Sequence, residues 1–84
     1  MGLGTVSLES ALAGATVETP RSSNLRLFHW VPDERVLYVT FRGGREYKYM
    51  LVQAGVVRGL YEASSRGSYF GRNIRKRYPY VRLG

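Results

Sequence analysis

The sequence predicts a small α+β domain, in which a three-stranded antiparallel β-meander is followed by two α-helices packed on one face of the sheet. Two observations lead to this expectation. Residues 24–51 alternate apolar and polar side chains with the period of two that strands require, and two turn signals interrupt them. Residues 53–78 then change to the spacing of three and four residues that is typical of amphipathic helices.

The size and composition of the chain set the outer bounds. It has 84 residues, 44% of them hydrophobic, and contains no cysteine. Such a length allows one small core, and the lack of cysteine excludes a disulfide framework and a cysteine-based zinc site. No apolar run approaches the ~18 residues of a membrane span, and the N-terminus lacks the basic residues that begin a signal peptide. We therefore expect a soluble, cytoplasmic protein without a membrane partner.

The first 20 residues differ in character from the rest. They are small, weakly polar and poor in aromatic side chains, and Gly14 and Pro20 interrupt any apolar stripe. We therefore expect a flexible N-terminal arm over residues 1–20 and a folded domain over residues 21–84.

The first expected strand covers residues 24–31, where apolar side chains occur on both faces. Strict alternation places Leu25, Leu27, His29 and Val31 on one face and Arg26, Phe28 and Trp30 on the other. The following Pro32-Asp33-Glu34 favours a turn, because proline fixes φ and aspartate can hydrogen-bond to nearby backbone.

Two further strands are expected after this turn. Residues 35–42 form the second, with Leu37, Val39 and Phe41 as its inward row, and residues 46–51 form the third. Gly43-Gly44 between them permits a tight hairpin, because glycine adopts positive φ without cost. Tyr47 and Tyr49 then fall on the face that the helices cover, so we interpret them as structural residues.

The helices follow directly. Residues 53–64 repeat apolar side chains at helical spacing, with Gly59 near the middle, where it costs about 1 kcal/mol relative to alanine but could allow a close approach to the sheet. The second helix is expected to run to Tyr78, where Pro79 ends it, and to bury Phe70, Ile74 and Tyr78 along one stripe.

Charge is the most informative bulk property. The net charge is +7, from 13 Lys and Arg against 6 Asp and Glu. All the basic residues and four of the acids lie in residues 21–84, so this part carries about +9, and no acid follows Glu62. Basic side chains can simply keep a small protein soluble. However, eleven of the thirteen are arginine, which favours the recognition of phosphate and carboxylate groups.

The candidate binding surface is the cationic side of the second helix together with the C-terminal segment. Its cations are Arg72, Arg75, Lys76, Arg77 and Arg82, with Arg66 and Lys48 as further members. Tyr38 and Trp30 are candidates for stacking on unpaired bases if their faces of the sheet are exposed.

Catalysis has little support in the sequence. There is no cysteine nucleophile, no Walker-type glycine loop and no pair of acids at a spacing suited to two-carboxylate chemistry. The lone His29 alternates with apolar residues and is interpreted as a core or edge residue rather than a general base. We therefore expect a protein that is not an enzyme and that carries neither metal nor cofactor.

The chain resembles the KTSC domain over roughly residues 21–83. The resemblance is carried by Tyr47-Lys48-Tyr49, Val52, Leu60, Ala63-Ser64-Ser65, Gly67, Tyr69-Phe70, Ile74-Arg75 and Tyr78, and upstream by Ser22-Ser23-Asn24-Leu25 and the strand that ends in Gly44. Gln53, Val57 and Gly71 depart from the family pattern, where proline, an aromatic residue and asparagine are usual. The family is named for the C-terminus of some lysyl-tRNA synthetases and also occurs as stand-alone bacterial or phage proteins, which implies RNA as the preferred polyanion.

Two functional hypotheses follow. The first is a nucleic-acid-binding module, with RNA preferred, that uses the basic second helix. The alternative is a protein-binding regulator, for example a phage accessory factor that docks on an acidic patch of a host enzyme such as RNA polymerase. Composition leaves both open, because an acidic protein groove and a phosphate backbone attract the same arginines.

Overall fold

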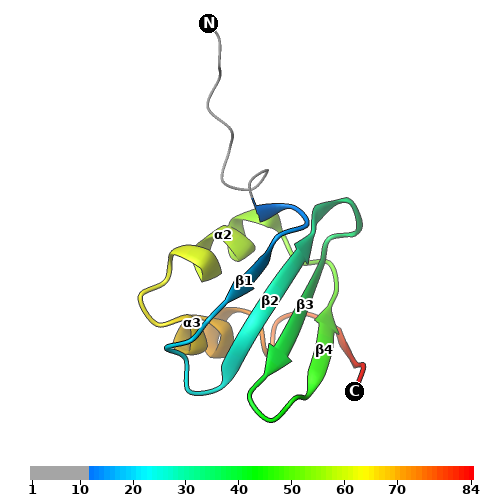
Figure 1. Cartoon of the computed structure of the whole chain (residues 1–84). Helices are drawn as coiled ribbons and strands as arrows, with labels where there is room; N and C mark the ends of the chain where they lie inside the picture. Colours follow the sequence, from blue (N-terminus) through cyan, green and yellow to red (C-terminus); the bar gives the residue numbers. More distant parts are fainter. Residues whose placement is uncertain (1–11) are drawn as a thin grey trace, which may run out of the picture.

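The computed structural model describes residues 12–84, which form one antiparallel sheet with two helices packed against it (Figure 1). The strands are β1 (Thr16–Glu18), β2 (Leu25–Val31), β3 (Val36–Phe41), β4 (Glu46–Tyr49) and β5 (Tyr80–Arg82), and they lie in the order β1-β2-β3-β4-β5. The helices are α2 (Ala54–Glu62) and α3 (Arg66–Asn73), and a 3₁₀ turn covers Pro32–Glu34. The α+β class with an antiparallel sheet and two helices is confirmed. The expected count of three strands is wrong, because the structure adds β1 and β5 at the two edges.

Part of the expected N-terminal arm belongs to the fold. β1 pairs with β2, with Val17 opposite Phe28, and Leu12 is 4% exposed within the core. The buried Thr19 hydroxyl donates a hydrogen bond to the carbonyl oxygen of Leu25 at 2.7 Å. The prediction of a flexible arm is therefore wrong for residues 12–20. Residues 1–11 lie outside the described part of the chain. A strand this short leaves no periodic signal, because backbone pairing at a sheet edge requires no apolar pattern.

β5 completes the other edge of the sheet. It pairs with β4, from Tyr47 opposite Arg82 to Tyr49 opposite Tyr80. Beyond the strand, the Leu83 backbone N–H donates to the Glu46 carbonyl oxygen at 2.7 Å. The C-terminal segment is therefore part of the sheet, and its side chains alternate between the two faces.

A break in alternation within β2 decides which face Trp30 occupies. The pairing register with β3 shifts between Leu25 and Leu27, as a β-bulge does. The bulge lets Leu25 share the core face with Phe28 and Trp30, which strict alternation would forbid. Trp30 is 2% exposed and lies in the core cluster. The expectation that Trp30 offers an exposed stacking plane is therefore wrong.

The helices pack closely on each other through a glycine. A Cβ atom added at Gly59 of α2 would collide with the ring of Tyr69 on α3. The Tyr69 hydroxyl donates to the Val56 carbonyl oxygen at 2.9 Å, which holds the ring in that place. Gly59 thus permits the approach of α3, and not of the sheet as the sequence had suggested. No helix among residues 12–84 is long and apolar enough to cross a membrane.

α3 is shorter than the sequence predicts. It ends at Asn73, and residues 74–77 form a turn, so Arg75, Lys76 and Arg77 do not lie on a helix. Ile74 is nevertheless fully buried beside Phe70, so the apolar spacing that suggested a longer helix is satisfied by the turn. Gly71 and Asn73 are poor helix formers, which favours the early end.

Candidate nucleic-acid interface

A groove of about 430 Å³ runs where the turn after α3 meets β4 and β5. We call it the basic-aromatic groove, and it is lined by Asn24, Phe41, Arg45, Tyr47, Tyr49, Arg75, Lys76 and Tyr80. Three lining residues are cations, four are aromatic and none is an acid. Its chemistry therefore suits a ligand that combines negative charge with a planar or apolar group.

The aromatic wall is a set of rings in mutual contact. The ring of Tyr80 lies 5.6 Å from the rings of both Tyr47 and Tyr49, and Phe41 lies 5.5 Å from Tyr47 in an edge-to-face arrangement. Tyr49 is only 3% exposed and forms the floor, whereas Tyr80 is 56% exposed. The pairing of β4 with β5 is what brings these tyrosines to one face. Tyr47 and Tyr49 thus have the structural role expected of them and also support the exposed ring of Tyr80.

The electrostatics of the floor connect the tyrosines to a cation. Burial raises the pKa of Tyr49 above its usual value near 10, and the neighbouring Tyr47 adds to the rise. The positive charge of Arg75 opposes the rise in that pKa. Tyr49 therefore stays protonated at neutral pH, and Arg75 lines the groove beside it.

The cations come from separate elements. Arg45 belongs to the β3–β4 hairpin, and its guanidinium carbon lies 5.4 Å from the centre of the Phe41 ring. Arg75 and Lys76 belong to the turn after α3, and both are exposed. Arg82 lies opposite Tyr47 in the sheet register and so faces the same side of the sheet. These residues place positive charge on two sides of the aromatic wall.

Two more of the predicted cations lie on α3 and on the turn that follows it. The exposed Arg72 and Arg77 are linked, because Arg77 Nε donates to the carbonyl oxygen of Arg72 at 3.1 Å. That bond satisfies one of the carbonyl groups left open at the helix end. The early end of α3 thus gathers Arg72, Arg75, Lys76 and Arg77 around one turn, which we call the basic turn.

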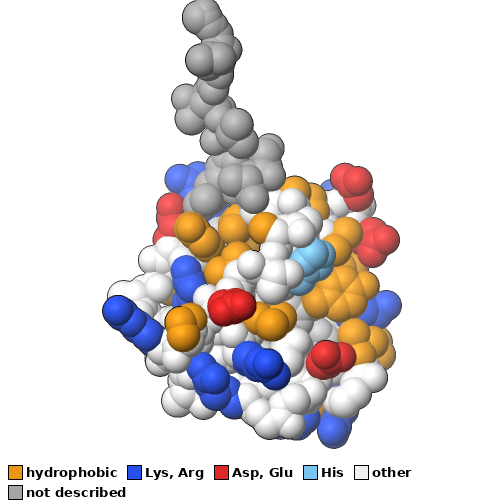
Figure 2. Space-filling model, in the orientation of Figure 1, with side chains coloured by type: hydrophobic (Ala, Val, Ile, Leu, Met, Phe, Trp, Pro, Cys, Tyr) orange, Lys and Arg blue, Asp and Glu red, His pale blue; other side chains and the backbone are white. Residues whose placement is uncertain are grey.

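Lys48 and Tyr38 lie elsewhere. They are sheet partners of each other on the face opposite the helices, and the Tyr38 ring lies 6.3 Å from that of His29. Figure 2 shows the side of the molecule on which the single histidine is visible, next to apolar side chains. These two predicted residues are therefore not brought together with the basic turn.

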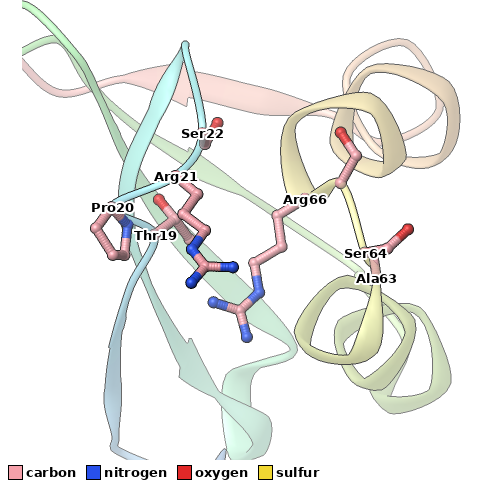
Figure 3. Close-up of a pocket in the computed structure, with 8 residues that line it drawn as sticks. Thr19, Pro20, Arg21, Ser22, Ala63, Ser64 and Arg66 are labelled. Carbon is pink, nitrogen blue, oxygen red and sulfur yellow. The ribbon is translucent and has the colours of Figure 1, made fainter.

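Arg66 has structural contacts. Its guanidinium donates two hydrogen bonds to the carbonyl oxygen of Tyr61, the shorter at 2.8 Å, and one to that of Glu18. It thereby ties the C-terminal end of α2 to β1. In Figure 3, Arg66 and Arg21 point toward one another in a separate pocket of about 360 Å³. Three of its five N–H donors are thus bound to backbone carbonyl oxygens, and Arg66 lines this pocket instead of the basic-aromatic groove.

Sequence reasoning missed the groove itself. Arg45 and Asn24 were not among the predicted residues, and Tyr80 was included only as part of the C-terminal segment, because the groove depends on β5 and on the position of the β3–β4 hairpin. The one usable signal was the alternation of Tyr80 and Arg82, which places both on one face if that segment is a strand. Among residues 12–84, no three His, Cys, Asp or Glu side chains are grouped as a metal site would require.

Comparisons with known proteins agree on the architecture. The family model described as the KTSC domain matches residues 21–78. A protein of Stutzerimonas stutzeri (strain A1501), described as uncharacterized, is 36% identical over 64 residues, which cover 75% of this chain and 90% of the relative. The crystal structure of the KTSC domain protein YPO2434 from Yersinia pestis superposes with a TM-score of 0.73 at 28% identity, over 83% of this chain and all of that one.

Proposed function

The chain belongs to the KTSC domain family, and we propose that it is a non-enzymatic module that binds nucleic acid, with single-stranded RNA preferred. The observation that carries the proposal is the basic-aromatic groove beside the basic turn. Cations there would meet phosphates, and aromatic rings would meet bases. The proposal includes a cytoplasmic location, where such a protein would encounter RNA.

The local charge balance supports a polyanionic partner. Six basic residues and no acid follow Glu62 in the sequence. Among the described residues, the recorded ion pair is Arg58 with Glu62 on the surface of α2, at 3.6 Å, and it does not involve the basic turn. Positive charge that is not neutralised locally attracts polyanions and accelerates their association.

The aromatic wall supports nucleic acid over an acidic protein. Rings in a cationic groove add stacking with unpaired bases to the phosphate contacts, and single strands offer such bases whereas duplexes do not. The preference for RNA follows from the lysyl-tRNA synthetase association that the family's name carries. Docking of the basic turn on an acidic protein patch is the competing outcome that the experiment must separate.

The first prediction concerns the basic turn. Arg72→Gln, Arg75→Gln and Lys76→Gln combined should leave the fold intact, because all three side chains are exposed. The affinity of the wild type for single-stranded RNA should fall with salt at a slope of about −0.7 per neutralised phosphate in a double-logarithmic plot. The triple variant should bind more weakly and lose about three such contacts from the slope.

A matched control is available in Arg21→Gln, Arg26→Gln and Arg35→Gln, which remove the same charge from exposed positions that do not line the groove. Fluorescence anisotropy with labelled single-stranded RNA, duplex RNA and DNA at several salt concentrations would measure all three proteins. Equal weakening by the two triple variants, or no binding to any nucleic acid at low salt, would overturn the proposal. Salt-sensitive binding to a protein at fixed stoichiometry would then favour the regulator.

A further inference from the structure

We propose that the basic-aromatic groove is a one-nucleotide subsite, in which an unpaired base stacks on the ring of Tyr80 while Arg75 and Lys76 hold its phosphate. This inference rests on the proposed nucleic-acid binding and goes beyond it, because it assigns base stacking to one residue and a length of one nucleotide to the site.

The ring of Tyr80 is a stacking plane that is already oriented. Tyr80 as a residue is 56% exposed, yet its ring lies 5.6 Å from the rings of Tyr47 and Tyr49, which are held on β4. A ring supported in this way loses little conformational entropy when a base covers it.

The cations fit the phosphate of the same nucleotide. Arg75 and Lys76 line the groove from the turn after α3, and Arg45 lines it from the β3–β4 hairpin. The side chains of Arg75 and Lys76 are exposed, and they line the same groove as the buried ring of Tyr49. Because Arg75, Lys76 and Tyr80 line the same groove, a phosphate held by the two cations can belong to the nucleotide whose base stacks on Tyr80.

The size of the groove suits a ligand of about one nucleotide. Its volume of about 430 Å³ lies at the lower end of the ~300–1,000 Å³ that is common for small-molecule sites. A base pair in a duplex cannot enter, because its faces are already covered by stacked neighbours.

Asn24 supplies a further polar group at the rim. Its Oδ1 atom accepts a hydrogen bond from the Ser22 hydroxyl at 2.9 Å, so its amide nitrogen remains available as a donor. A base carbonyl or a ribose hydroxyl of the stacked nucleotide would accept a hydrogen bond from this amide nitrogen.

The test compares an RNA oligonucleotide with an abasic one that keeps the same phosphates, using wild type, Tyr80→Leu, Tyr80→Phe and Tyr38→Leu. Leucine keeps the apolar bulk that β5 needs but has no aromatic face, and denaturation midpoints check that each variant is folded. Tyr38→Leu is the matched control, because Tyr38 lies in a strand on the opposite face of the sheet.

The wild type should bind the normal oligonucleotide about five- to a hundredfold more tightly than the abasic one. Tyr80→Leu should erase that difference without changing the salt slope, while Tyr80→Phe and Tyr38→Leu should retain it. Equal affinity of the wild type for both oligonucleotides, with a steep salt slope, would overturn the subsite and leave the proposed function standing. Absence of binding to either would overturn both.

Discussion

At the scale of single residues, the environment of Tyr49 at the floor of the groove favours the protonated form of its hydroxyl. Tyr49 is buried among other tyrosines, so its neutral form is favoured in the folded protein and its pKa is raised, mainly by desolvation. The folded state therefore holds this proton more tightly than the unfolded chain does. The contribution of protonated Tyr49 to the free energy of unfolding is fully present below pH ~10. It is lost as the pH rises through the pKa that Tyr49 has in the folded state.

We therefore predict that Tyr49→Phe reduces the loss of stability above pH ~10, because phenylalanine has no proton to release. Urea denaturation at a series of alkaline pH values would measure the free energy of unfolding of both proteins. Arg75→Gln should act in the opposite direction, since Arg75 lowers the pKa of Tyr49. An unchanged alkaline slope in Tyr49→Phe would show that Tyr49 is not the group responsible.

The same scale shows why Trp30 was misassigned and Tyr80 overlooked. The phase of a strand can be read from the sequence only while alternation holds, and the bulge between Leu25 and Leu27 breaks it. Tyr80 lies in a strand of three residues, and such a strand carries too few side chains to show a period. Leu37, Val39 and Phe41, by contrast, follow strict alternation and face the core as predicted.

At the scale of elements, the packing of α2 on α3 depends on the space at Gly59. Filling that space forces the Tyr69 ring to move and breaks its hydrogen bond to the Val56 carbonyl oxygen. Overpacking of this kind costs about 1–3 kcal/mol, against a gain of about 1 kcal/mol from replacing a helical glycine by alanine.

We predict that Gly59→Ala lowers the free energy of unfolding by up to about 2 kcal/mol, which is the overpacking cost less the gain from replacing a helical glycine. Gly55→Ala in the same helix is the matched control, because a Cβ atom there meets nothing within 4 Å, and it should be neutral or stabilising by up to ~1 kcal/mol. Chemical denaturation would measure both. If Gly59→Ala were as stable as Gly55→Ala, the close approach of Tyr69 would not constrain the helix pair.

Element types were largely readable from the sequence, and element ends were not. The change from a period of two to helical spacing near residue 52 correctly separates β4 from α2. The end of α3 was misplaced because Ile74 and Tyr78 keep helical spacing while the backbone has already become a turn. This difference matters for function, because the turn presents Arg75, Lys76 and Arg77 differently from a helix face.

At the scale of the whole molecule, the core extends across all the layers described. Leu12, ahead of β1, belongs to the same buried cluster as Trp30 and Phe70. Residues 12–20, which precede the family match at residue 21, therefore contribute to the stability of the domain.

We predict that Leu12→Ala destabilises the protein by about 2–3 kcal/mol, as expected for the loss of a buried leucine side chain. Leu83→Ala is the matched control, because Leu83 is 48% exposed, and it should change stability by no more than about 0.5 kcal/mol. Thermal and urea denaturation would measure both variants. A wild-type midpoint for Leu12→Ala would place residue 12 outside the cooperative unit.

The order of the strands also has a consequence for how the groove assembles. β1 to β4 are joined by short connections, whereas β5 pairs with β4 only after two helices have intervened. Closing the longer loop costs more entropy, so this pairing should form late in folding and open early in native-state fluctuations. When β5 is detached, the rest of the sheet remains, but Tyr80 and Arg82 no longer lie beside the tyrosines of β4. A ligand in the groove would then stabilise the pairing of β5 with β4. Its binding should slow amide hydrogen exchange in β5 more than in any other strand.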